Sequence, residues 1–120
     1  MFCILFDKMS CIIPGYNFKY TINIKFKIGF NNFDVNKFYY NLIYRLSLLN
    51  AGRLQPEIII KAVKINYKTN SVIFIVIFKN VQDINDIKYF KSNKGKIGIK
   101  KTVIRMLNEE KKYKNTVIVN

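Results

Sequence analysis

The sequence contains no histidine, which excludes imidazole general-base catalysis and histidine-ligated metal sites. It has two cysteines, Cys3 and Cys11, which we interpret as buried reduced thiols; a disulfide or a pair of metal ligands is the alternative. The longest purely apolar run, residues 72–78, is far shorter than the roughly 20 residues that a membrane-spanning helix needs. The sequence therefore predicts no membrane span and no metal or other cofactor.

Acidic residues are scarce: 7 Asp and Glu stand against 21 Lys and Arg, and the net charge is +14. None of the acids is spaced to form a carboxylate pair for general acid–base catalysis, so we expect a protein that is not an enzyme and has no small-molecule substrate. A charge excess of this size favours a polyanionic partner, with nucleic acid first and an anionic membrane second. Because almost all the cations are lysines, phosphate contacts are expected rather than base recognition, for which arginine is better suited.

The length of 120 residues corresponds to one domain. Residues 1–18 have no clean periodicity and are predicted to be an N-terminal extension, with residues 19–120 forming the domain. The N-terminus is a poor export signal and is too acidic and arginine-free for a mitochondrial presequence. The abundance of Ile, Asn, Lys, Phe and Tyr is typical of an A/T-rich genome, so we expect a mitochondrial protein that is encoded in the organelle.

Residues 33–52 carry a complete set of helix signals. Asp34 can cap the first turn, and Gly52 can end the helix in a left-handed conformation. Between them, large apolar side chains recur at steps of three and four residues and form one stripe: Val35, Phe38, Tyr39, Leu42, Ile43, Leu46 and Leu49. A stripe this wide requires a surface to pack on, which the neighbouring strands can provide.

The region before this helix has the pattern of a strand. Residues 19–28 alternate between an apolar face that runs from Tyr20 to Ile28 and a polar face that carries Lys19, Lys25 and Lys27. This alternation predicts a half-buried strand whose wet face is cationic.

Two further β segments follow the helix. The alternation in residues 58–67 slips near Ala62 and Val63, which suits a β-bulge. After a tight turn at residues 68–71, the apolar run at 72–78 predicts a strand that is covered on both faces, or on one face with a partner on the other.

The last third of the chain is predicted as a loop, a basic strand, a short helix and a final strand. Residues 79–86 are polar and loop-like, and residues 87–101 are extended and basic. Thr102 is a candidate N-cap for a helix that ends near Asn108, and residues 115–119 form the final strand.

The basic residues of the first strand and of the last third are the candidate RNA-binding residues. The uncompensated charge favours RNA or DNA contact over a solvated surface at these positions: Lys25, Lys27, Lys79, Lys88, Lys91, Lys94, Lys96, Lys100, Lys101 and Arg105. The tetrad at residues 95–98, Gly-Lys-Ile-Gly, is similar to the glycine clamp of KH modules. That clamp joins two helices, whereas the preceding residues alternate as a strand would, so a flexible strand entry is the favoured interpretation.

The order of elements and several short motifs resemble the tenth protein of the small ribosomal subunit. Residues 22–27, Ile-Asn-Ile-Lys-Phe-Lys, match the family's first strand and lead through Gly29 to the long helix. Later, residues 96–99 match a strand, 101–103 (Lys-Thr-Val) a helix start, and 117–119 (Val-Ile-Val) the closing strand. The family's loop motif, Ser-Pro-His-Val, is matched only at Val81.

This resemblance implies an α+β, ferredoxin-like fold: a split β-α-β sandwich with two helices on one face of a four-stranded sheet. It also implies a non-catalytic, structural role in the head of the small subunit of a mitochondrial ribosome. There the chain would contact ribosomal RNA and neighbouring head proteins.

Two alternatives stay open. Residues 87–99 are also similar to part of the eighth small-subunit protein, which this chain would match in truncated form. The chain could instead be an accessory subunit of an organellar membrane complex, with its apolar N-terminus at a lipid or protein surface.

Overall fold

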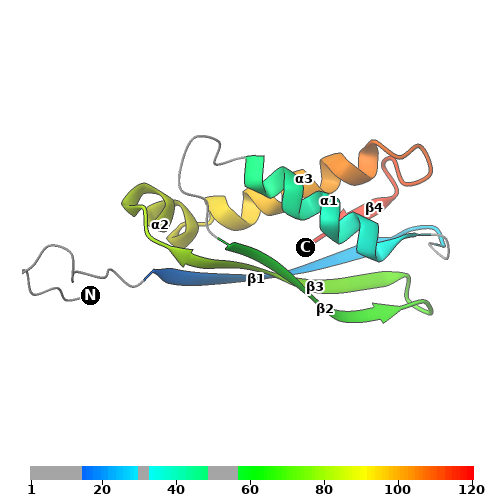
Figure 1. Cartoon of the computed structure of the whole chain (residues 1–120). Coiled ribbons are helices and arrows are strands. Elements are labelled where there is room, and N and C mark those ends of the chain that lie inside the picture. The colour runs from blue at the N-terminus through cyan, green and yellow to red at the C-terminus, as the bar shows by residue number, and fades with distance from the viewer. Residues whose placement is uncertain (1–14, 30–32, 49–56) are drawn as a thin grey trace, which may run out of the picture.

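The computed structural model describes residues 15–29, 33–48 and 57–120 (Figure 1). These residues form four strands and three helices. In chain order they are β1 (Tyr16–Phe26), α1 (Val35–Leu48), β2 (Glu57–Asn66), β3 (Ser71–Val81), α2 (Ile84–Lys91), α3 (Lys94–Asn108) and β4 (Val117–Val119). The predicted features at Cys3, Cys11, Leu49 and Gly52 lie outside the described residues.

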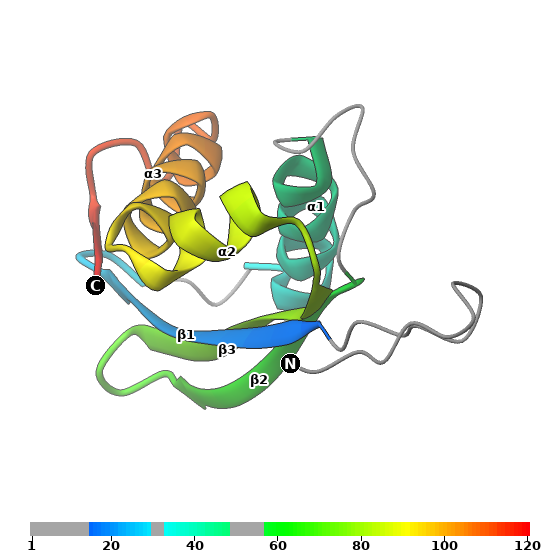
Figure 2. The same ribbon diagram turned by 90° about the vertical axis from the view of Figure 1, so that its left-hand side faces the viewer.

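The strands form one antiparallel sheet in the order β2-β3-β1-β4. All three helices lie on the same side of this sheet, with α1 and α3 running along it and α2 near one end (Figures 1 and 2). This is the α+β, ferredoxin-like arrangement that was expected. It differs in having the short helix α2 in addition to the expected pair.

The alternation of β1 places its apolar side chains under the helices. Ile22, Ile24 and Phe26 are at most 2% exposed. The strand begins at Tyr16, three residues earlier than predicted, and it ends at Phe26. Ile28 was expected on the buried face, but it lies beyond the strand and is 39% exposed.

Helix α1 begins and packs as its sequence predicts. The backbone N–H of Lys37 donates to Asp34 Oδ1 at 3.0 Å, so Asp34 caps the first turn. Phe38, Leu42 and Leu46 are buried at steps of four residues, on the stripe that faces the sheet.

Strands β2 and β3 form a hairpin whose details follow the sequence. Their register shifts between Ala62 and Lys64, which confirms the predicted bulge. In the turn, Asn66 Oδ1 accepts from the N–H groups of Lys68 and Thr69, and Asn70 has a positive φ of 53°. Asparagine tolerates that conformation better than most residues.

The predictions for residues 79–101 are wrong. Strand β3 continues to Val81, and residues 87–91 and 94–101 are helical rather than extended. Asp83 caps α2, because its carboxylate accepts from the N–H groups of Asn85 and Asp86. The hydroxyl of Thr102 donates to the Gly98 carbonyl at 2.9 Å from within α3, so Thr102 is not an N-cap.

The sequence resembles an alternating pattern in this region because Gly95 and Gly98 stand between larger residues. Both glycines belong to helix α3. Gly95 lies on the buried side of α3, in line with Ile99 and Val103. A side chain at Gly95 would collide with the protein, since a Cβ there would lie 2.6 Å from the Tyr20 hydroxyl oxygen. The tetrad is thus the first turn of a helix packed on β1, neither a flexible strand entry nor a clamp loop.

Tyr20 connects β1 to the end of α2. Its hydroxyl donates to the Phe90 carbonyl at 2.8 Å, and its ring lies edge-on to Phe78 with 6.1 Å between centroids. Burial, with a smaller contribution from Tyr89, raises the pKa of Tyr20 to about 12. The folded state therefore holds this phenol in its protonated, donating form.

Gly95→Ala is expected to lower the free energy of unfolding by about 1–2 kcal/mol, because the new methyl group overpacks against an anchored ring. Gly98→Ala is the matched control. The new Cβ would meet the hydroxyl of Tyr89, but this side chain is 40% exposed and can move away. The free energy of unfolding of Gly98→Ala should therefore rise by up to about 1 kcal/mol, because alanine has the higher helix propensity. Urea denaturation of both variants measures the difference. A Gly95→Ala variant as stable as Gly98→Ala would contradict the packing argument.

Tyr20 also predicts a pH dependence at high pH. The unfolded chain loses the phenolic proton near the ordinary pKa of 10.0, and the folded chain retains it until about 12. Stability contributed by this group is therefore present below pH 10 and is lost as the pH rises to 12. The stability difference between the wild type and Tyr20→Phe, followed by denaturant titration, should shrink across that interval; a constant difference would contradict it.

Candidate functional site

Two surfaces together carry eleven of the described cations. The first, which we call the α2–α3 basic surface, consists of Lys88, Lys91, Lys94, Lys96, Lys100, Lys101 and Arg105. The second is the sheet face that no described helix covers (Figure 2). It carries Lys19, Lys25, Lys61 and Lys64, and we call these four the sheet lysines.

The α2–α3 basic surface follows from the packing of α3. Gly95, Ile99 and Val103 face the core, so at 100° per residue Lys94, Lys101 and Arg105 project from the opposite side. These three residues span about 16 Å along the helix axis at 1.5 Å per residue. Residues 87–108 contain no Asp or Glu, and Glu109, the next residue, interacts electrostatically with Arg105 at one end of the surface.

Helix α2 contributes the other end of this surface. Lys88 and Lys91 are both exposed. The Lys91 ammonium nitrogen lies 4.9 Å from the centre of the Tyr16 ring, a cation–π contact that positions it beside the start of β1. The seven predicted residues from Lys88 to Arg105 therefore belong to one continuous pair of helices.

The remaining predicted residues lie elsewhere. Lys25 is on the uncovered face of the sheet, and Lys27 follows β1 as an exposed residue. Lys79 is directly opposite Glu57 in the β2–β3 pairing, so an acidic residue of the neighbouring strand offsets its charge. The structure thus brings together seven of the ten candidates and separates these three from them.

Sequence reasoning did not select three of the sheet lysines as binding residues. Lys19, Lys61 and Lys64 join Lys25 on the uncovered face because residues directly opposite one another in a sheet share a face. The alternation of β1 indicated a cationic face at Lys19. The sequence could not predict the pairing of β2 with β3, which places Lys61 and Lys64 on the same face.

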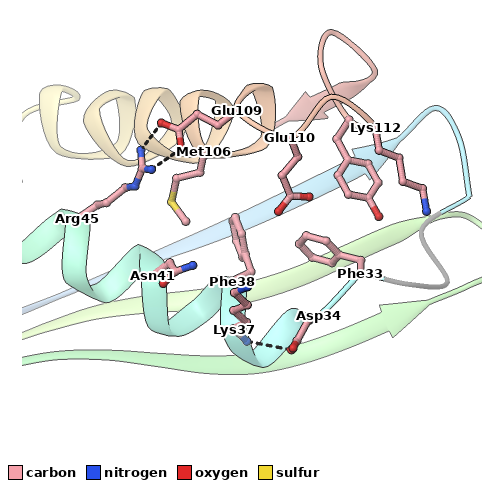
Figure 3. Close-up of a pocket in the computed structure, with 11 residues that line it drawn as sticks. Phe33, Asp34, Lys37, Phe38, Asn41, Arg45, Met106, Glu109, Glu110 and Lys112 are labelled. Carbon is pink, nitrogen blue, oxygen red and sulfur yellow. Dashed lines mark hydrogen bonds and ion pairs between the residues drawn. The ribbon is translucent and has the colours of Figure 1, made fainter.

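A cleft of about 340 Å³ lies between α1 and the end of α3 (Figure 3). Aromatic side chains of Phe33, Phe38 and Tyr113 line it, and their rings contact one another. Both charge signs are present at its rim, with Lys37 and Lys112 near Asp34 and Glu110. This mixed charge favours a polyanion less than the α2–α3 basic surface does.

An ion pair closes one end of this cleft. Arg45 Nη1 donates to Glu109 Oε1 at 2.8 Å, and its second nitrogen donates to Glu109 Oε2, so the contact is bidentate (Figure 3). The hydrogen bonds from Arg45 lower the pKa of Glu109 and raise that of Arg45. The pair joins the last turn of α1 to the end of α3, which makes it a structural contact.

The described residues contain no cluster of three potential metal ligands among Asp, Glu, Cys and His. None of the described helices combines the length and the hydropathy needed to cross a membrane. Comparisons of this chain with protein-family models, with curated proteins and with solved structures gave no match. Function is therefore inferred from the geometry and charge of the surfaces described above.

The Arg45–Glu109 pair predicts a dependence on acid pH. Because the pKa of Glu109 is lower in the folded state than its ordinary 4.5, the pair contributes stability above that value and loses it as the pH falls through the folded pKa. Glu109→Gln should therefore be less stable than the wild type at neutral pH and equally stable in strong acid. Thermal unfolding at a series of pH values measures this, and a difference that persists in acid would contradict it.

Proposed function

We propose that this chain is a non-catalytic RNA-binding protein that uses the α2–α3 basic surface to contact phosphates. We further propose that it is a structural constituent of the head of the small ribosomal subunit, in a mitochondrial ribosome. The observation that carries the first part is the set of seven cations on two adjoining helices, three of which, Lys94, Lys101 and Arg105, share one side of α3.

The composition of this surface supports phosphate contact. Six of its seven cations are lysines, which act as flexible point charges rather than as planar bidentate donors. Neutralising RNA phosphates releases condensed counterions, which makes the affinity strongly dependent on salt and largely independent of sequence. Binding directed by the shape of a folded RNA fits such a surface.

The ribosomal part of the proposal is supported by the resemblance and by the ferredoxin-like fold. The match of residues 22–27 to the family's first strand agrees with β1, and the match of residues 117–119 agrees with β4. The match of residues 96–103 does not support it, because these residues lie inside α3 rather than at a strand and a helix start. Residues 87–99, which carry the similarity to the eighth small-subunit protein, lie in α2, the turn after it and the start of α3.

The combined substitution of Lys94, Lys96, Lys100 and Lys101 by Ala tests the binding surface. If each lysine contacts one phosphate, the slope of log affinity against log salt should fall in magnitude by about three for single-stranded RNA. Fluorescence anisotropy with a labelled RNA oligonucleotide, at several salt concentrations, measures the slope.

The matched control replaces the sheet lysines Lys19, Lys25, Lys61 and Lys64 by Ala. This variant loses the same charge from the opposite side of the sheet and should retain most of the salt slope. Equal losses in the two variants would show that net charge, rather than the α2–α3 basic surface, determines binding. Circular dichroism of both variants establishes that they are folded.

Sedimentation of a native organelle extract at low salt tests the ribosomal assignment separately. The chain is expected to sediment with the small subunits and to dissociate from them as salt is raised. Sedimentation away from small subunits at low salt would overturn the ribosomal role, while leaving RNA binding to be decided by the anisotropy measurement.

A further inference from the structure

We propose that the uncovered face of the sheet docks an amphipathic helix of a partner protein, one whose apolar stripe is flanked on both sides by acidic side chains. This surface is distinct from the α2–α3 basic surface, which lies on the other side of the molecule (Figures 1 and 2). The inference therefore does not depend on RNA binding.

An apolar strip runs along the middle of this face. Ile73, Ile75 and Ile77 alternate with the buried core residues of β3, so their side chains lie on the side away from the helices. Ile59 of β2 is directly opposite Ile77 and extends the strip sideways. Ile77 is only 4% exposed and lies buried among its neighbours, so Ile59, Ile73 and Ile75, which are partly exposed, provide the accessible apolar surface. We call these four residues the isoleucine strip.

The sheet lysines stand on both sides of the isoleucine strip. On β1, Lys19 is directly opposite Ile77, and Lys25 is opposite Ser71 at the other end. On β2, Lys61 is opposite Ile75, and Lys64 is opposite Ile73. All four lysines are exposed, so a partner must present negative charge along both edges of its apolar contact.

The dimensions of the strip fit a helix. From residue 73 to residue 77 the strand advances about 13 Å, which corresponds to a little more than two helical turns. The neighbouring strands lie about 4.8 Å to either side, so the lysines on them flank a helix of about 10 Å diameter seated on the strip. Apolar residues at i, i+3, i+4 and i+7 would contact the isoleucines, and acids on both flanks would meet the lysines.

RNA fits this face less well than a helix does. Sheet surfaces that bind single-stranded RNA stack bases on aromatic side chains. From residue 18 onward, the aromatic residues of β1 and β3 lie on the helix side, and the strip offers aliphatic side chains alone. Five aromatic residues belong to the core or pack against it: Phe18, Tyr20, Phe26, Phe74 and Phe78. A second copy of this chain is disfavoured because two faces with four lysines each repel one another.

The test uses the full chain and three synthetic peptides of about 18 residues, a length at which amphipathic helices form in isolation. The first has a leucine stripe flanked by glutamates, the second has lysines in place of the glutamates, and the third has the first composition in scrambled order. We expect the first to bind, and the other two to bind about tenfold more weakly or less. Amide chemical shifts of the labelled chain should change along β1, β2 and β3 rather than along α3.

Two variants locate the contact. Ile75→Thr, which keeps a β-branched side chain in the strand, should weaken binding of the first peptide about tenfold. The combined change of Lys61→Glu and Lys64→Glu should weaken it by at least as much. The matched control is the combined change of Lys101→Glu and Arg105→Glu on α3, which alters the charge equally and should leave the affinity within about threefold.

Three results would overturn the proposal. One is the absence of shift changes on the sheet with the first peptide. Another is equal weakening by the control variant, which would indicate non-specific charge attraction. The third is displacement of the peptide by an oligouridine RNA with shift changes at the same sheet amides, which would make RNA the occupant of this face.

Discussion

The fold depends on the burial of one face of the two central strands. Ile22, Ile24 and Phe26 of β1 and Phe74 and Val76 of β3 lie at most 2% exposed under the helices. Each fully buried side chain of this size contributes about 1.5–3 kcal/mol. Because the period of a strand is two, burying one set of residues fixes which set faces outward. The cationic sheet face is therefore a direct consequence of how the core forms.

The same constraint determines where the helices place their charges. Helix α3 turns its buried stripe toward β1, and this leaves lysines on the remaining surface. Gly95 allows the close approach, since the Tyr20 ring occupies the space where a side chain would be. The molecule consequently has two basic surfaces on opposite sides.

The elements whose signals are local could be predicted from the sequence. The stripe and the Asp34 cap of α1, the alternation of β1 and the bulge after Ala62 all depend on residues within a few positions of one another. Helix α2 also has a local signal, the Asp83 cap, which was missed, whereas α3 could not be predicted from local signals. The two glycines of α3 lower its helix propensity. Gly95 is required because Tyr20, which is distant in the sequence, occupies the space that a side chain would fill. Packing between distant segments overrode the local preference.

The candidate site was predictable in part for the same reason. Charge and composition were sufficient to select the lysines and Arg105 between residues 88 and 105, although with the wrong secondary structure. They could not show that Lys79 is opposite Glu57, or that Lys61 and Lys64 share a face with Lys19. Those relations depend on strand register, which is determined by pairing between separate segments rather than by composition.

The pairing of β1 with β4 has a consequence for how the chain folds during synthesis. Ile24, Lys25 and Phe26 are opposite Val119, Ile118 and Val117, so the last strand pairs with one end of the first described strand. The β2–β3 hairpin can form as soon as its short turn is made, but this end of β1 stays unpaired on that edge until β4 has left the ribosome. Contacts between distant segments form slowly, and an unpaired strand edge is prone to association. Until then, this edge of β1 is open to wrong pairing, and Lys19 and Lys25 of the strand provide charge repulsion that opposes it.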